Sequence, residues 1–196
     1  MDGTLIMQRL DFGLMKERLG APPSADILAH VASLSPEERA TATATIEEME
    51  REAMLQMEAM HGAEDLLRWI DSRGIRRGLL TRNNATVVEH MHTQLWRDIG
   101  PFEPALSRER PEFVKPSPGG IHHCLSVWGV AAEEVVMIGD SAKDDVVAGA
   151  RAGVTTVLLL SDARSAPLEG EQKPTHVVEN LAQVPALLES CFDLLE

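Results

Sequence analysis

Carboxylates gather at two places in the sequence, each beside a glycine. Asp2 lies in the stretch Met-Asp-Gly-Thr at the start of the chain, and Asp140 follows an apolar run and a glycine, with Asp144 and Asp145 close behind. Carboxylates that are brought together repel one another unless a cation lies among them. Oxygen ligands of this kind suit a hard ion such as Mg²⁺. If the fold joins the two places, the pattern predicts a magnesium site.

A hydroxyl, a lysine and an arginine follow other apolar or turn segments. Thr81, Arg82 and Asn83 come directly after two leucines, and Lys115 precedes Pro116. Lysine and hydroxyl groups bind phosphoryl oxygens, and the N–H groups after Thr81 precede a helix, whose N-terminus favours anions. The set predicts phosphoryl transfer, in which a protein mainly positions groups and neutralises charge. Arg82 either contacts a substrate phosphate or carboxylate or lies on the rim.

Strands and helices that alternate along the chain must bring these residues together. Continuous apolar runs predict strands at 76–81, 104–107, 135–138, 155–160 and 176–178, and helical patterns at 63–73, 85–96, 116–128, 144–152 and 181–195 lie between or after them. Such runs are typical of a parallel sheet with helices on both faces. We expect an α/β fold, a doubly wound, Rossmann-like parallel sheet. The carboxyl ends of its strands would carry the site.

The segment before Gly62 differs, because it contains helical patterns with no strand between them. Helices are predicted at 11–20, with Phe12, Met15 and Leu19 on one side, at 26–34, and from Pro36 to about Met60. Ser35 caps the third, and proline in the first helical position agrees with this start. We predict a small helical cap at 7–60, inserted after the first strand, with 1–6 and 61–196 forming the core.

Composition limits the partners. The chain has 196 residues and a formal net charge of −13, which disfavours nucleic acid. Its two cysteines are too few for a disulfide framework, and no stretch approaches the roughly 20 apolar residues of a membrane span. The N-terminus does not read as a signal peptide. We expect a cytoplasmic protein with neither a nucleic-acid nor a membrane partner, while the sequence does not indicate the oligomeric state.

Four motifs in order resemble the signatures of the haloacid dehalogenase superfamily. They read MDGTL, GLLTRN, VKPSP and VVMIGDSAKDDVVAGARAG. Each alone is a weak signal, but all four in order, each at a strand end or turn, are specific. The resemblance extends from Met1 to about Leu188 and is closest to the phosphoglycolate phosphatase-like subgroup. It implies a phosphoric monoester hydrolase that uses Mg²⁺ and acts on a small phosphorylated metabolite.

The resemblance also implies roles for individual residues. Asp2 would be the general acid and base, and its backbone carbonyl would bind the metal. Thr81 would hydrogen-bond the transferring phosphoryl group, and Lys115 would neutralise its charge. Arg82 and Asn83 are further candidates for substrate binding.

The resemblance further assigns metal ligands. Asp140 would bind Mg²⁺ directly. For the second acid we prefer Asp145, as an outer or water-mediated ligand, because Gly153 follows it at the family's usual distance of eight residues. Asp144 is the alternative.

The chain departs from the family in its first motif. In Asp-x-Asp-Gly-Thr the first aspartate is the nucleophile. Met1 fills the x position, so the nucleophile and its strand are not in the sequence. A lost central strand would remove several buried side chains worth about 1.5–3 kcal/mol each, against a total stability of about 5–15 kcal/mol. We therefore interpret Met1 as an internal methionine taken as the start.

Three other functions stay open. A pseudoenzyme would bind a phosphate ligand without turnover, although the intact charge cluster then has no evident use. A phosphomutase of the same family would need a cap that excludes water. A receiver-like phospho-acceptor domain shares the sheet, the acids and the lysine, but the helical insertion argues against it.

Overall fold

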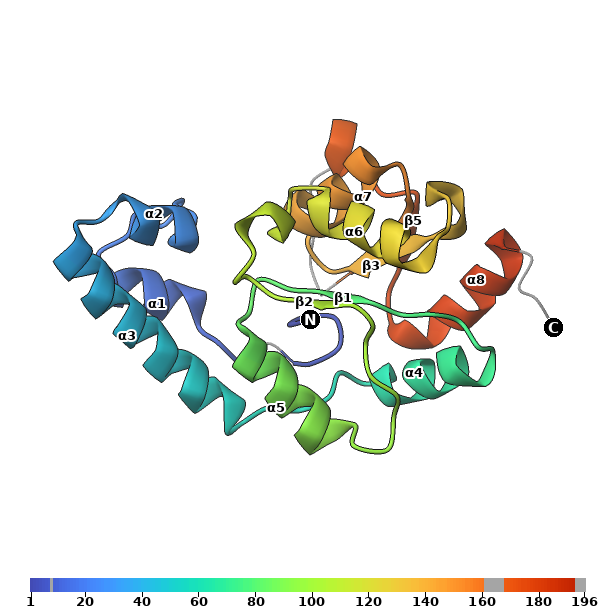
Figure 1. Cartoon of the computed structure of the whole chain (residues 1–196), viewed down its shortest axis with the longest axis horizontal. Coiled ribbons are helices and arrows are strands. Elements are labelled where there is room, and N and C mark those ends of the chain that lie inside the picture. Colours follow the sequence, from blue (N-terminus) through green and yellow to red (C-terminus); the bar gives the residue numbers. More distant parts are fainter. Residues whose placement is uncertain (8, 161–167, 193–196) are drawn as a thin grey trace. The chain divides into compact units, whose positions relative to one another are not determined.

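The computed structural model describes residues 1–7, 9–160 and 168–192, and the chain divides into two compact units. One unit combines Met1–Met7 with Glu58–Glu196, and the other is Gln8–Met57. Figure 1 traces both along the chain. The predicted cap, 7–60, corresponds most nearly to the second unit, and its role as a cap stays a prediction.

Three capped helices make up the Gln8–Met57 unit. They are α1 (Phe12–Arg18), α2 (Ile27–Ser33) and α3 (Pro36–Met54). The side chains of Asp11 and Asp26 each accept a backbone N–H of the helix that follows, at 2.9 and 3.0 Å. Such N-caps satisfy donors that have no partner within the helix.

The start of α3 follows the sequence prediction closely. Ser35 caps the helix, and Glu38 reaches back to the Ser35 N–H at 3.1 Å, which completes a capping box. Pro36 occupies the first turn, where its missing N–H costs nothing. The capping residues therefore fix where α3 begins.

The core of this unit is small. Met15, Ile46 and Met49 are buried together, and Leu19 packs against them. Helices α1 and α2 both contact α3. Phe12 does not join this core, although it lies three residues before Met15 in α1, since Phe12 is 42% exposed whereas Met15 is 2% exposed.

The predicted end of the third helix is wrong. Helix α3 ends at Met54 rather than near Met60. The reason is backbone pairing with the start of the chain, because the Met7 N–H donates to Glu58 O and the Met60 N–H donates to Leu5 O, both at 2.9 Å. Residues 58–60 therefore leave the helix although their apolar spacing continues it.

The larger unit alternates helices with strands. Its α-helices and strands are α4 (Ala63–Ser72), β1 (Leu79–Leu80), α5 (Ala85–Leu95), β2 (Ala105–Leu106), α6 (Gly119–Trp128), β3 (Val136–Gly139), α7 (Val147–Ala152), β4 (Thr155–Leu159), β5 (His176–Val178) and α8 (Val184–Cys191). Short helical turns are η1 (Pro111–Phe113), η2 (Ala132–Glu134), η3 (Ala142–Val146), η4 (Gly170–Gln172) and η5 (Leu181–Gln183). No helix in the described part of the chain is long and apolar enough to cross a membrane.

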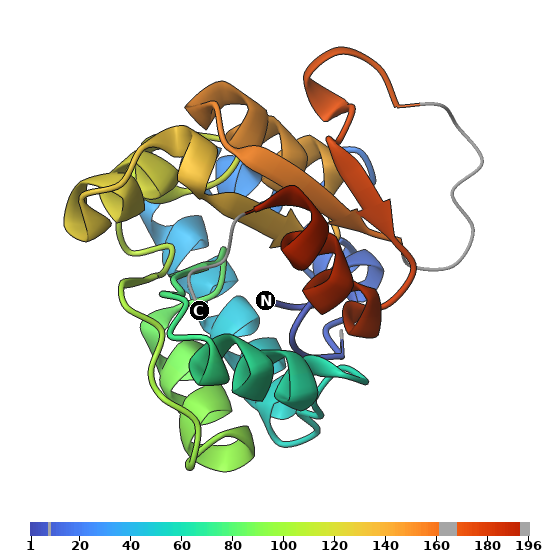
Figure 2. The same ribbon diagram turned by 90° about the vertical axis from the view of Figure 1, so that its right-hand side faces the viewer.

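All strand pairs of this unit are parallel, as predicted, but the described residues form two sheets rather than one. Strand β1 pairs with β2, and β4 lies between β3 and β5 (Figure 2). Thus one sheet edge belongs to β1 and another to β3. The expectation of a single continuous sheet is not met, because no described strand pairs β1 with β3.

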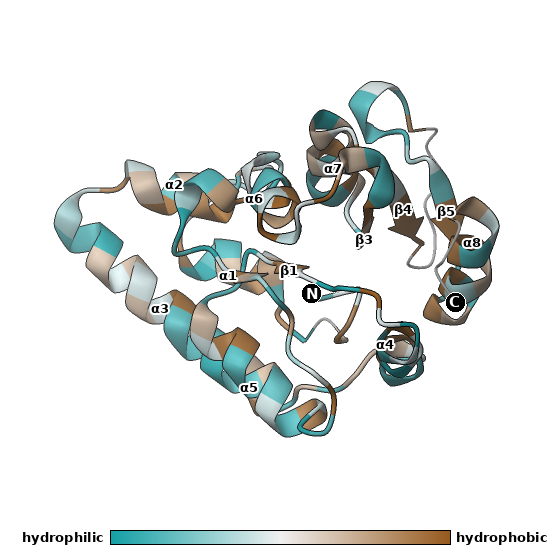
Figure 3. Cartoon of the chain, turned by 45° about the vertical axis from the view of Figure 1, so that its right-hand side comes forward, coloured by the Kyte–Doolittle hydropathy of each residue, from teal (hydrophilic) through white to brown (hydrophobic). Residues whose placement is uncertain are grey.

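Apolar strands form the interior of the larger unit. Valine, leucine, isoleucine and methionine fill most positions of β3 and β4 (Figure 3), and Val157 and Leu158 are each 1% exposed. A second cluster joins Leu80 of β1 to Ile121 of α6 and Ala148 of α7. Burial on both faces explains why these strands lack polar alternation.

Two predicted helices differ from the structure. The helix expected at 144–152 begins earlier, as the π-helical turn η3, in which Ser141 O accepts the N–H groups of Asp145 and Val146 at 2.8 and 3.2 Å. The helix expected at 181–195 is the turn η5 followed by α8, which ends at Cys191. The last predicted residues, 193–195, lie outside the described residues.

Candidate active site

The first residues of the chain form a tight turn. The Met1 carbonyl accepts the N–H groups of Thr4, Leu5 and Ile6 at 3.2, 2.8 and 3.1 Å. Gly3 has φ = +69°, a backbone conformation that favours glycine. The turn presents Asp2, which is half-buried, while Met1 is 8% exposed.

Asp140 meets this turn at the carboxyl end of β3. The Thr4 hydroxyl donates to Asp140 Oδ1 at 2.9 Å. A Cβ atom at Gly3 would collide with the Asp140 carboxylate, so this close approach also depends on glycine. The fold therefore joins the two acidic places of the sequence.

Asn83 links the end of β1 to Asp2. Thr81 is buried, and its N–H donates to Leu106 O of the neighbouring strand at 2.9 Å. The Asn83 N–H donates to Thr81 Oγ1 at 3.1 Å, and Asn83 Nδ2 donates to Asp2 Oδ2 at 2.5 Å. Asn83, predicted as a substrate contact, is thus placed where it orients the Asp2 carboxylate.

Lys115 and Asp145 form a buried ion pair. Lys115 Nζ lies 2.5 Å from Asp145 Oδ1, and the Ser141 N–H donates to Asp145 Oδ2 at 3.0 Å. Burial acts to raise the pKa of Asp145, but the charge of Lys115, the nearby N-terminal amine and the hydrogen bonds from Lys115 and Ser141 hold that pKa below its usual value. Both carboxylate oxygens of Asp145 therefore accept hydrogen bonds, and Asp145 fixes the position of the Lys115 ammonium group.

Asp144 faces a different partner from Asp145. Its Oδ2 lies 3.5 Å from the Arg82 guanidinium and accepts the Ser141 hydroxyl at 3.2 Å. The Arg82 side chain is 29% exposed. In the π-helical turn, Asp144 therefore pairs with Arg82 while the adjacent Asp145 pairs with Lys115. Of these two acids only Asp145 is buried.

Direct contacts connect the predicted site residues to one another. Asp140 bonds the turn that carries Asp2, and the Asp145 carboxylate lies against Gly139, the residue before Asp140. Asp145 in turn pairs with Lys115. The structure thereby gathers Asp2, Lys115, Asp140 and Asp145, with Thr81 joined to them through Asn83.

The oxygen atoms at this place are of the kind that bind Mg²⁺. Asp140 lies against the turn that carries Asp2, so carboxylate and backbone oxygens, which hard cations prefer, are side by side. The described residues contain no group of three His, Cys, Asp or Glu side chains arranged to hold a metal ion. A complete set of ligands for Mg²⁺ would therefore need backbone oxygens, water or a further acid.

The loop after β2 also contacts the site, although no sequence motif marks it. The Arg108 N–H donates to Asn83 O at 3.0 Å, and Glu109 Oε1 accepts the Ala85 N–H at 2.9 Å. These residues belong to no recognisable motif. Only the pairing of β1 with β2 brings the ends of the two strands together, so no local signal could have found them.

Comparison with known proteins agrees with this geometry. The HAD-hydrolase-like family model matches residues 113–184. A haloacid dehalogenase-like hydrolase domain-containing protein of Arabidopsis thaliana is 37% identical over 210 residues, with 99% of this chain and 83% of the relative covered. A phosphoglycolate phosphatase of Nitrosococcus oceani is 31% identical over 128 residues, covering 65% of this chain and 56% of the relative.

Solved structures share the fold. The crystal structure of a predicted phosphoglycolate phosphatase from Haemophilus somnus matches with a TM-score of 0.72 at 17% identity, covering 95% of this chain and 94% of that one. The HAD-hydrolase YfnB of Bacillus subtilis, solved with magnesium bound, matches with a TM-score of 0.66 at 18% identity, covering 96% and 95%. These structures show the fold, and the Arabidopsis relative shows that the chain belongs to the haloacid dehalogenase superfamily of hydrolases.

Proposed function

We propose that this protein is a magnesium-dependent phosphatase that hydrolyses a small phosphomonoester through an aspartyl-phosphate intermediate. The observation that carries the proposal is that Asp140 contacts the turn of Asp2, while the Asp145 carboxylate beside it holds the buried Lys115. A cluster of acids beside one buried lysine suits a reaction in which negative charge moves between oxygens.

Each side chain of the site has a task in this proposal. Asp2, held by Asn83, protonates the leaving alkoxide and later takes a proton from the attacking water. Lys115, held by Asp145, neutralises the phosphoryl charge. Thr81 hydrogen-bonds the phosphoryl group from the end of β1.

Magnesium is the proposed cofactor. The Asp140 carboxylate and the Asp2 backbone carbonyl would hold it, with Asp145 as an outer ligand through water. When bound, the ion neutralises negative charge on the phosphoryl oxygens. The 2.9 Å hydrogen bond from Thr4 holds Asp140 against the turn that carries Asp2.

The nucleophile is proposed to be an aspartate directly before Met1. The Asp-x-Asp-Gly-Thr pattern gives this position, which is outside the 196 residues. One observation supports it, because β1 and β3 each have an edge that no described strand covers. We propose that a strand ending in this aspartate pairs with these edges.

The helical unit Gln8–Met57 is proposed as the cap that selects the substrate. It interrupts the sequence between the turn that carries Asp2 and the rest of the core, which is where the family's caps are inserted.

Cys124 and Cys191 are both free thiols, which agrees with a reducing cytoplasm as the compartment.

Release of inorganic phosphate tests the proposal. The intact protein, with its native upstream sequence, would be assayed on a panel of small phosphomonoesters with Mg²⁺ and with a chelator. Asp140→Asn should lower turnover at least about tenfold, which corresponds to about 1.4 kcal/mol in the barrier. Asp65→Asn on the exposed face of α4 is the matched control.

Three results would count against the proposal. Phosphate release that is insensitive to both chelation and Asp140→Asn would remove the metal site. Isomerisation of a sugar phosphate without net release would identify a phosphomutase instead. Ligand binding without turnover in the intact protein would favour the pseudoenzyme.

A further inference from the structure

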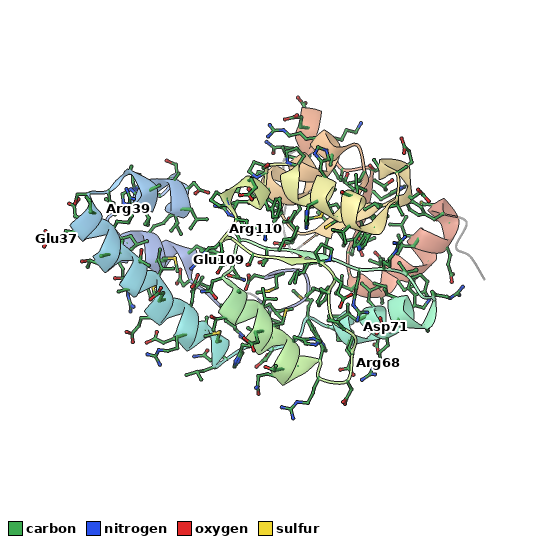
Figure 4. The ribbon with its side chains drawn as sticks, in the orientation of Figure 1. Glu37, Arg39, Arg68, Asp71, Glu109 and Arg110 are labelled. Atoms are coloured by element: carbon green, nitrogen blue, oxygen red, sulfur yellow. The ribbon has the colours of Figure 1, made fainter. Side chains whose placement is uncertain are left out.

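Two loops at the ends of β1 and β2 are joined by a pair of hydrogen bonds, which we name the β1–β2 clasp. The Arg108 N–H donates to Asn83 O at 3.0 Å, and Glu109 Oε1 accepts the Ala85 N–H at 2.9 Å. Glu109 lies on the loop after β2, at the start of α5 (Figure 4). One loop therefore holds the other at two positions.

Glu109 binds a group that α5 itself cannot satisfy. Ala85 is the first residue of α5, and the first N–H groups of a helix lack partners within it. Asn84 accepts the Val87 N–H at 2.9 Å, so Glu109 and Asn84 each cap a different donor. The partial positive charge of the helix N-terminus also favours a carboxylate there.

The surroundings keep Glu109 ionised. Burial acts to raise the pKa of Glu109, but hydrogen bonds from Ser107, the Ala85 N–H and its own N–H, together with the charge of Arg108, hold that pKa below its usual value. The carboxylate is thus kept in the form that accepts the Ala85 N–H.

Asn83 connects the β1–β2 clasp to the candidate active site. The side chain of Asn83 donates to Asp2 Oδ2 at 2.5 Å, and its N–H donates to Thr81 Oγ1 at 3.1 Å. Asn83 lies on a short loop between the end of β1 and the start of α5. The contacts with Arg108 and Glu109 therefore hold the two peptide groups that follow Asn83, and Asn83 in turn holds Asp2.

We propose that Glu109 is a positioning residue, which fixes the loop at 81–85 so that Asn83 orients the Asp2 carboxylate. The inference rests on the proposed function only where it calls Asp2 the acid and base. Glu109 touches no reacting atom in this account. A role limited to capping α5 would lower stability and leave Asp2 in place.

The side-chain amide resonance of Asn83 tests the positioning without any assay of activity. Asp2→Ala gives the chemical shift of this amide without its carboxylate partner. In Glu109→Ala we expect the amide to move toward that reference. Glu109→Gln keeps an acceptor oxygen and should stay near the wild-type shift. Glu112→Ala, an exposed change on η1 in the same loop, is the matched control.

Kinetics of the intact protein supply the second readout. Glu109→Ala should lower kcat by roughly tenfold with little change in KM, as expected when a catalytic group is displaced but substrate binding is kept. Glu109→Gln should restore most of kcat. If Glu109→Ala does not fold, Ser107→Ala removes only the hydrogen bond that orients Glu109 and should move both readouts in the same direction.

The outcomes separate this inference from the proposed function. An unchanged Asn83 amide in Glu109→Ala overturns the inference, whatever the activity. A lower melting temperature with an unchanged kcat also overturns it, because it leaves only a helix cap. If the wild-type intact protein releases no phosphate, the proposed function fails, and the amide shifts still decide whether Glu109 positions Asp2.

Discussion

Lys115 Nζ lies 2.5 Å from Asp145 Oδ1, and the two side chains are 8% and 5% exposed. Lys115 comes from the loop before α6, and Asp145 comes from the π-helical turn after β3. A buried charge is costly unless an opposite charge and hydrogen bonds accompany it. The pair therefore keeps a lysine charged inside the site, and each member depends on the other.

Breaking this pair from one side should be more harmful than removing it whole. Lys115→Met leaves Asp145 buried without its cation, which we expect to lower the free energy of unfolding by about 3–5 kcal/mol. Asp145→Asn leaves Lys115 without its anion. The free energy of unfolding that the double variant loses should be clearly less than the sum of the losses in the two single variants, as measured by urea unfolding. Losses that add up would show that the two residues are not coupled.

Asp145 should also make stability depend on pH. Its pKa in the folded protein is below the ordinary value of 3.8, so its contribution is fully present above that value and is lost as the pH falls below it. The stability difference between wild type and Asp145→Asn should shrink as the pH is lowered from about 7 to about 3. A difference that is constant across this range would contradict the lowered pKa.

Gly3 is expected to be sensitive for two separable reasons. A side chain there is strained by the positive φ and would also collide with the Asp140 carboxylate. Gly74 has a similar φ, +63°, and open space around it, so Gly74→Ala reports the strain alone, about 1–2 kcal/mol. Gly3→Ala should lower stability more than Gly74→Ala does in the same thermal or urea measurement. It should also abolish most phosphate release. Equal losses in the two variants would argue against the contact between the turn and Asp140.

The two cysteines should differ in reactivity. Burial raises the pKa of the Cys124 thiol to about 11, whereas Cys191 is exposed. Because the thiolate is the reactive form, iodoacetamide at mildly alkaline pH should modify Cys191 in the native protein and Cys124 only after unfolding. Peptide mass spectrometry distinguishes the two. Early labelling of Cys124 would show that the core around α6 opens.

The strands and the place of the site were predictable because they depend on simple regularities. Continuous apolar runs fixed β3, β4 and β5 to within a residue or two at each end, and the rule that parallel strands end at one edge brought Asp2 near Asp140. The preference for Asp145 over Asp144 came from the family's usual spacing to Gly153. The structure pairs Asp145 with Lys115, and its part in binding a metal stays a prediction.

What could not be predicted depends on contacts between distant segments. Helix α3 ends early because residues 58–60 pair with the first turn of the chain, although their apolar spacing continues the helical pattern. Glu109 has a role only because β1 and β2 are neighbours. The π-helical turn, which sends Asp144 and Asp145 to different cations, has no recognised sequence pattern.

The identity of the phosphorylated residue tests the central claim most directly. The intact protein from its own cells would be mixed with Mg²⁺ and a turned-over phosphomonoester, quenched in acid and digested, and its N-terminal peptide examined by mass spectrometry. The account predicts a phosphoryl group on an aspartate directly before Met1, and its loss when that aspartate is replaced by asparagine. A phosphoryl group on any other residue, or a native N-terminus at Met1 with undiminished turnover, would contradict it.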